Sequence, residues 1–104
     1  MGEYRSKLDI IADMLRVASN GANKTKIMYQ ANLSYKLLTK YLKELVKAEL
    51  VHFQRTESSY VLTQKGLEFL QRYKEYSRRN KHIEKQFNDL HNKRKALTDL
   101  LMTQ

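Results

Sequence analysis

The 104-residue sequence contains no cysteine, no proline and no tryptophan, and it has only three glycines. The absence of cysteine excludes disulfides and thiolate metal sites. Because proline and glycine are the strongest breakers of regular structure, their scarcity favours helix. No stretch approaches the roughly 20 consecutive apolar residues of a membrane-spanning helix, and the N-terminus lacks the pattern of a secretory signal peptide. We therefore expect a cytoplasmic protein with no membrane partner.

Sequence motifs of catalysis and cofactor binding are missing as well. The three histidines, His52, His82 and His91, have no spacing suited to a metal site. The chain has no glycine-rich phosphate loop and no nucleophile elbow, and no two carboxylates are placed to converge. The sequence therefore predicts no metal, no cofactor, no small-molecule substrate and no enzymatic activity.

The most prominent feature of the composition is positive charge. Twenty Lys and Arg against eleven Asp and Glu give a net charge of +9 at pH 7. Such a surplus is typical of proteins that bind polyanions, and a generically basic soluble protein is the alternative. Hydrophobic residues make up 41% of the chain, which is enough for a modest core and argues against a disordered chain. The position of the basic residues along the chain must decide between a polyanion-binding protein and a generically basic one.

Three helices and a hairpin are predicted for the head, residues 1–66. Apolar spacings of three and four indicate a helix over 6–20, and capping residues indicate helices over 25–31 and 34–48. Two β-prone stretches around a polar turn predict a hairpin over 50–62. The short helix, the three-residue turn and the longer helix form a helix-turn-helix, and the hairpin completes the element order of a winged helix. The expected fold class is mainly α, an α+β winged helix-turn-helix.

A long helix should follow Thr63, because no strong breaker occurs after it, and residues 67–104 are predicted to form a dimerisation helix. Ten positions follow the alternating spacing of three and four that marks a coiled coil. They are Phe69, Tyr73, Tyr76, Asn80, Ile83, Phe87, Leu90, Arg94, Leu97 and Leu101. Eight of these ten are apolar or aromatic, which predicts a two-stranded coiled coil and hence a homodimer. A helix packed back along its own head is the alternative, and the heptads leave the strand orientation open.

The predicted third helix carries its basic residues on one face. At about 100° per residue, four of its lysines fall within an arc of roughly 60° opposite the apolar side. The second helix of a helix-turn-helix enters the major groove of DNA. This row of lysines is therefore well placed to contact phosphates on both walls of the groove. The alternative is a solvated face that binds nothing. The candidate DNA-binding residues are Lys24, Lys26, Ser34, Tyr35, Lys36, Thr39, Lys40, Lys43, Lys47 and Arg55. Because this helix has no outward Arg, Gln or Asn, we expect weak sequence preference.

Other basic residues are weaker candidates for contact with DNA. Arg5 and Lys7 precede the first helix, and Arg55 lies in the tip of the hairpin, where Glu57 opposes its charge. A basic cluster on the long helix either adds DNA contacts or keeps the helix soluble. It consists of Arg78, Arg79, Lys81 and His82.

Three stretches of the chain resemble a known family. Residues 6–11 read SKLDII, residues 24–35 read KTKIMYQANLSY and residues 62–66 read LTQKG. Together they resemble the archaeal Sso-ten-a family of small chromatin-associated proteins, and the resemblance covers about residues 6–70. It implies a winged-helix head on an antiparallel coiled-coil dimer that binds double-stranded DNA with little sequence preference in the nucleoid.

The same resemblance implies that the third helix faces DNA through the positions of Lys36, Lys40 and Lys43. Similar proteins also occur as transcription regulators, so a site-specific regulator of palindromic operators is an alternative function. A winged-helix adaptor that binds protein is a second alternative. An architectural DNA-binding protein is the function that we expect first.

Overall fold

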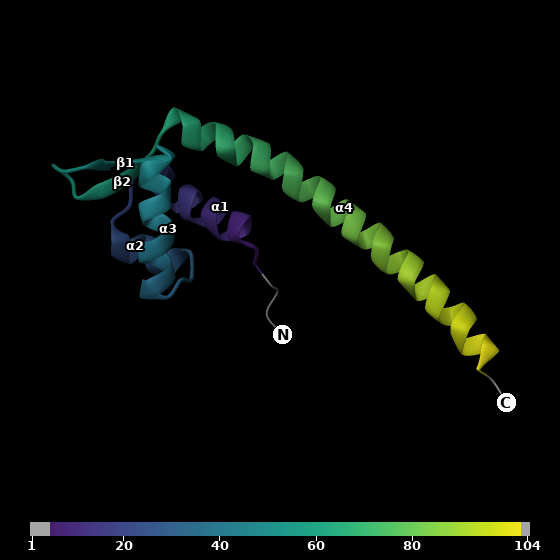
Figure 1. Ribbon diagram of the computed structural model, residues 1–104. Helices are drawn as coiled ribbons and strands as arrows, with labels where there is room; N and C mark the ends of the chain where they lie inside the picture. Colours follow the sequence, from purple (N-terminus) through teal and green to yellow (C-terminus); the bar gives the residue numbers. More distant parts are fainter. Residues whose placement is uncertain (1–4, 103–104) are drawn as a thin grey trace. The chain divides into compact units, whose positions relative to one another are not determined.

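A computed structural model describes residues 5–102 (Figure 1). Its elements, in chain order, are α1 (Lys7–Val17), the short 3-10 helix η1 (Ala18–Asn20), α2 (Lys24–Gln30), α3 (Tyr35–Lys47), β1 (Val51–Gln54), β2 (Ser59–Leu62) and α4 (Gln64–Leu101). The mainly α winged-helix fold with a long C-terminal helix is confirmed. The ends of the predicted domains, residues 1–4 and 103–104, lie outside the described residues.

The chain divides into two compact units, residues 1–73 and 74–104. The first unit holds α1–α3, the hairpin and the first turns of α4, whereas the second consists of the remainder of α4. The sequence pattern predicts a dimerisation helix over residues 67–104. The first turns of α4 pack on the head, which places them in the first unit.

Helix α1 begins at a capping box. The Ser6 hydroxyl accepts a hydrogen bond from the backbone N–H of Asp9 at 3.2 Å, and the Asp9 carboxylate accepts one from the backbone N–H of Ser6 at 2.9 Å. These bonds satisfy two of the donors that a helix start leaves unpaired. Beyond η1 the chain turns at Gly21, whose φ of 85° is a left-handed conformation suited to glycine.

The core of the head is made by one face of each of the three helices. Its largest fully buried side chains are Met14, Leu15, Ile27, Leu38 and Leu45. Leu8 shares the apolar spacing of three and four that predicts this helix, which places it on the core side, but it is exposed. Leu8 lies in the first turn of α1, at the edge of the core. The buried face of the helix includes Ile10 and Met14 instead.

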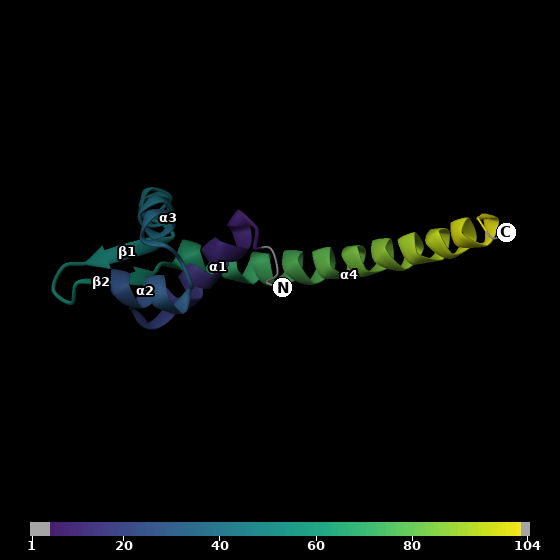
Figure 2. The same cartoon turned by 90° about the horizontal axis from the view of Figure 1, so that it is seen from below.

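The hairpin pairs β1 with β2 in antiparallel register, with Phe53 opposite Tyr60 and Gln54 opposite Ser59. Ala22, in the loop before α2, adds a bridge to this sheet through two backbone hydrogen bonds with Tyr60, at 3.0 and 2.8 Å. The turn at residues 55–58 forms the wing tip. In both Figure 1 and Figure 2 the wing tip extends beyond the three helices of the head.

The backbone at the start of α4 lies very close to the backbone of the segment that follows α3. The Thr63 hydroxyl accepts a hydrogen bond from the backbone N–H of Gly66 at 3.0 Å and donates one to the Glu49 carbonyl at 2.6 Å. A Cβ at Gly66 would stand 2.2 Å from the Leu50 carbonyl oxygen and 2.5 Å from Leu62 Cδ1. Only glycine permits this approach of the two backbones.

Three aromatic or aliphatic residues of α4 belong to the head. Phe69 and Leu70 are partly buried against its core. The Tyr73 hydroxyl donates a hydrogen bond to the Asp9 carboxylate, and the Arg16 guanidinium lies 5.6 Å from the centre of the Tyr73 ring. The first two residues of the predicted dimer seam, Phe69 and Tyr73, therefore already contact the head of their own chain.

Candidate nucleic-acid interface

The helix-turn-helix is held in shape by side-chain caps. The Asn23 side chain accepts a hydrogen bond from the backbone N–H of Lys26 at 2.8 Å at the start of α2. The Ser34 hydroxyl accepts one from the backbone N–H of Leu37 at 3.2 Å at the start of α3. Between the helices Asn32 has a φ of 55°, the left-handed conformation that asparagine tolerates better than most residues. The two caps and the turn at Asn32 together fix the orientation of α3 relative to α2.

Helix α3 has one buried and one basic face. Leu38, Leu42 and Leu45 are buried in the core. The opposite face carries four exposed lysines, which we call the α3 row: Lys36, Lys40, Lys43 and Lys47. None of the four forms an ion pair with any residue in the range 5–102. The positive charge of the α3 row is thus not compensated within the described chain.

The only acidic residue on α3 is neutralised by a partner from α1. The Lys7 ammonium lies 2.8 Å from the Glu44 carboxylate. The hydrogen bond and charge of Glu44 raise the pKa of Lys7 above its ordinary value. The ring of Tyr41 lies 5.8 Å from the Lys7 ammonium and 5.7 Å from the Lys40 ammonium. Lys7, a weaker candidate for contact with DNA, therefore pairs with Glu44 inside the head, and its contact with DNA stays a prediction.

Arg5 also has a structural role that the sequence did not reveal. Its guanidinium donates hydrogen bonds to the carbonyls of Ala31 at 2.7 Å and Asn32 at 2.8 Å, and to the Asp13 carboxylate at 2.9 Å. The two carbonyls lie at the end of α2, where backbone acceptors lack intrahelical partners. Arg5 therefore connects the start of the head to the turn of the helix-turn-helix. Its contact with DNA stays a prediction.

The remaining candidates on α2 and α3 lie at the surface. Lys24, Lys26 and Tyr35 are exposed. The Thr39 hydroxyl donates to the Tyr35 carbonyl at 2.9 Å, so it is engaged within its own helix. Tyr29 is 74% exposed on α2, and the sequence analysis did not single it out. Its position two residues after the buried Ile27, on the opposite side of a short helix, is the signal that would have found it.

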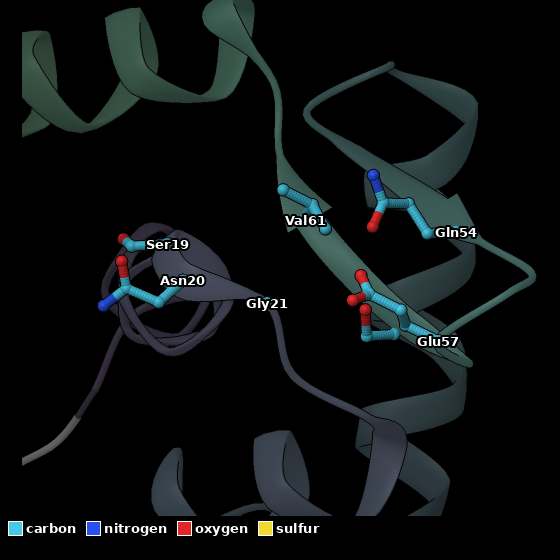
Figure 3. A pocket seen from close by; sticks show the side chains of 7 residues that line it. Ser19, Asn20, Gly21, Gln54, Glu57 and Val61 are labelled. Carbon is cyan, nitrogen blue, oxygen red and sulfur yellow. The ribbon is translucent and has the colours of Figure 1, made fainter.

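The wing contributes less basic character than α3. Arg55 is exposed in the wing tip. A shallow polar hollow separates the wing from η1 (Figure 3) and contains the Glu57 carboxylate. It is lined by Ser19, Asn20, Gly21, Gln54, Glu57, Ser59 and Val61. Because these lining residues include an acid and no base, the hollow does not suit a phosphate group.

A second feature of interest is the exposed apolar row on α4. The large apolar residues of the predicted seam beyond Tyr73 are between 52% and 87% exposed. They are Tyr76, Ile83, Phe87, Leu90, Leu97 and Leu101. Asn80 and Arg94, the polar members of the predicted seam, are exposed as well. Contiguous exposed apolar surface of this kind marks an interaction site.

Within residues 5–102, no three His, Asp or Glu side chains gather in a way that could hold a metal ion. No helix in this range combines the length and the apolar character needed to cross a bilayer.

Comparison with known proteins connects this geometry to a family. The sequence pattern of the winged helix-turn-helix family matches residues 4–81. The fold is similar to the crystal structure of Sso10a-2, a DNA-binding protein from Sulfolobus solfataricus, with a TM-score of 0.65 and 24% identity over 96% of this chain and 100% of that chain. An uncharacterized protein of Methanocaldococcus jannaschii is 37% identical over 75 residues, which cover 71% of this chain and 35% of that protein. The chain thus spans about a third of the length of this relative.

Proposed function

The chain belongs to the winged helix-turn-helix family, and from this premise we propose that it is a homodimer that binds double-stranded DNA with low sequence specificity. The observation that carries the proposal is the uncompensated α3 row on the helix that enters the major groove in such motifs. The described DNA binding of the similarly folded Sso10a-2 supports it. We further propose that the protein has an architectural role in the nucleoid and is therefore located in the cytoplasm. This role requires no catalytic activity.

Low specificity follows from the chemistry of α3. Lysine binds phosphate as a point charge and lacks the planar fork with which arginine reads guanine. The hydroxyls of Ser34 and Thr39 are already bonded to the backbone of their own helix. Tyr35 is thus the exposed residue best placed to touch a base edge. Affinity should come mainly from phosphate neutralisation and the release of condensed counterions.

Dimerisation through α4 is supported by the exposed apolar row. A single chain leaves Ile83, Phe87 and Leu90 in water, and pairing two helices along this face would bury them. The resemblance to the Sso-ten-a family favours the antiparallel arrangement. A dimer presents two α3 rows, so that both heads add to the affinity for DNA.

The first experiment is a salt titration of binding to two duplexes of unrelated sequence. We expect similar affinities for both, with a steep linear fall of log affinity against log salt, since each neutralised phosphate contributes about 0.9 to the slope. A preference of about a thousandfold for a genomic operator over random DNA would contradict the proposal. That result would favour the alternative of a site-specific regulator.

The second experiment removes the α3 row. The α3 variant replaces its four lysines with glutamine: Lys36→Gln, Lys40→Gln, Lys43→Gln and Lys47→Gln. The control variant removes the same charge from α4: Arg72→Gln, Arg79→Gln, Lys93→Gln and Lys95→Gln. We expect the α3 variant to lose most of its duplex affinity while the control variant loses little. Equal affinity of the two variants would show that α3 is not the DNA surface, and an adaptor that binds protein would then be the better hypothesis.

A further inference from the structure

A second set of uncompensated cations lies on α4, entirely within the second unit. We call it the rod stripe: Lys74, Arg78, Lys81 and Lys85. Their spacings of four, three and four residues put them within an arc of roughly 60° on one side of the helix. We propose that the rod stripe is a second duplex-binding surface, separate from the α3 row. The proposal extends the DNA-binding function argued above and rests on it only for the identity of the ligand.

Three other cations of α4 are engaged in ion pairs along the helix. Arg72 pairs with Glu68 at 3.5 Å, and Arg79 pairs with Glu75 at 4.0 Å. Lys93 pairs with Asp89 at 3.2 Å. Each pair follows the favourable order in which the acid precedes the base by four residues.

The members of the rod stripe, by contrast, have no ion pair with any residue between 5 and 102. The cluster indicated by sequence proximity included Arg79, which the structure pairs with Glu75. It left out Lys74 and Lys85, which share the face of Lys81. A shared face of the helix together with the lack of an ion pair, rather than proximity in the sequence, therefore defines this surface.

The rod stripe is compatible with dimerisation. On the helix it is centred roughly 180° away from the apolar row of Ile83, Phe87 and Leu90. Pairing along the apolar row would therefore leave the stripe on the outside of the coiled coil. A dimer would carry two stripes in addition to its two α3 rows.

The arrangement suits a duplex better than a membrane. Helices that lie in a bilayer surface insert their apolar face and keep their charged face in the headgroup region. On α4 the rod stripe and the apolar row lie on opposite faces. In the proposed dimer the apolar row is buried between the two helices, so a bilayer would contact only the cations of the stripe. From Lys74 to Lys85 the stripe runs about 16 Å along the helix. Over that distance a duplex presents one phosphate charge per about 1.7 Å, enough for all four side chains to reach a partner.

The test compares a rod variant with the control variant and the unchanged protein. The rod variant carries Lys74→Gln, Arg78→Gln, Lys81→Gln and Lys85→Gln, which keep good helix formers and leave the apolar row untouched. Both variants lose four charges per chain from the same helix, so a difference between them cannot come from net charge. In a salt titration on one duplex, we expect the slope of the rod variant to fall by roughly 3–4 per chain. The slope of the control variant should stay near that of the unchanged protein.

The α3 variant separates this inference from the proposed function. If both surfaces bind DNA, the α3 variant keeps a weak, salt-dependent affinity that disappears when the rod substitutions are added. If the α3 variant binds like the unchanged protein but the rod variant fails, the rod stripe stands and the proposed role of α3 falls. If the rod and control variants have the same slope, the rod stripe is only a solvated face and the inference is overturned.

Three further measurements complete the test. Circular dichroism and light scattering check that each variant keeps its helix content and mass. If the fourfold rod variant fails either check, the double variants Lys74→Gln with Arg78→Gln and Lys81→Gln with Lys85→Gln replace it, each with an expected slope loss of about 2 per chain. Binding to phosphatidylglycerol vesicles that depends on the stripe, with unchanged duplex binding, would overturn the inference in favour of a membrane partner.

Discussion

Replacement of Ile83 and Leu90 by lysine should convert the proposed dimer into a monomer. In a single chain these side chains are 63% and 67% exposed. Full burial of such a side chain contributes about 1.5–3 kcal/mol, so burial of the exposed two thirds contributes about 1–2 kcal/mol. A dimer holds two copies of each residue, and their loss therefore removes about 4–8 kcal/mol from association. Since 1.4 kcal/mol is tenfold in affinity, the dissociation constant should rise by about three to six orders of magnitude.

Light scattering or sedimentation at micromolar concentration measures the outcome directly. Asn88→Lys with Asn92→Lys provides a matched control, because it adds the same charge to the opposite face of the same helix. We expect the control to keep the dimer mass and Ile83→Lys with Leu90→Lys to lose it. A seam variant that keeps the dimer mass would refute the assignment of this face. Loss of the dimer in both variants would show that added charge, rather than the apolar row, is responsible.

Three further outcomes follow from contacts in the head. Gly66→Ala should lower the free energy of unfolding of the head, measured in urea, by about 2–3 kcal/mol. The added Cβ would clash with the Leu50 carbonyl, and this cost outweighs the helix preference of alanine. Unchanged stability would contradict the close approach of the Gly66 and Leu50 backbones. Glu44→Gln should tighten duplex binding, because it removes the acid of α3 and frees Lys7; weaker binding would count against the α3 row. The Lys7–Glu44 pair raises the pKa of Lys7 from 10.5, so its stabilisation is complete below that value and lost as pH rises through the raised pKa. The stability difference between Glu44→Gln and the unchanged protein should therefore be constant from about pH 7 to about pH 9.

The contacts of Arg5 and Lys7 are ones that the sequence pattern did not predict. Arg5 precedes α1 and Lys7 is its first residue, and both are basic, so contact with DNA was the weaker prediction made for them. Lys7 instead meets Glu44, 37 positions away, and Arg5 meets the Ala31 carbonyl, 26 positions away. Such partners become neighbours only when α1 packs against the helix-turn-helix. A periodic pattern within one segment carries no information about them.

Gly66 and Tyr73 illustrate the same limit at the start of α4. The heptad pattern included Tyr73 in the seam, because periodicity cannot tell which partner an apolar face meets. In the folded chain Tyr73 bonds to Asp9 of the head. Gly66 looks like a weak point of a helix, but it permits contact with the Leu50 carbonyl. Both roles depend on which backbones come together.

The sequence by itself determined the helices of the head, the hairpin, the lysine face of α3 and the apolar face of α4. These features depend on caps, turns and a repeat of about 3.6 residues, all of which act within a few positions along the chain. Only the tertiary structure decided that Lys7 pairs with Glu44 and that Arg5 binds the carbonyls of Ala31 and Asn32. These contacts depend on distances of a few ångströms between residues far apart in the chain, and folding alone sets those distances.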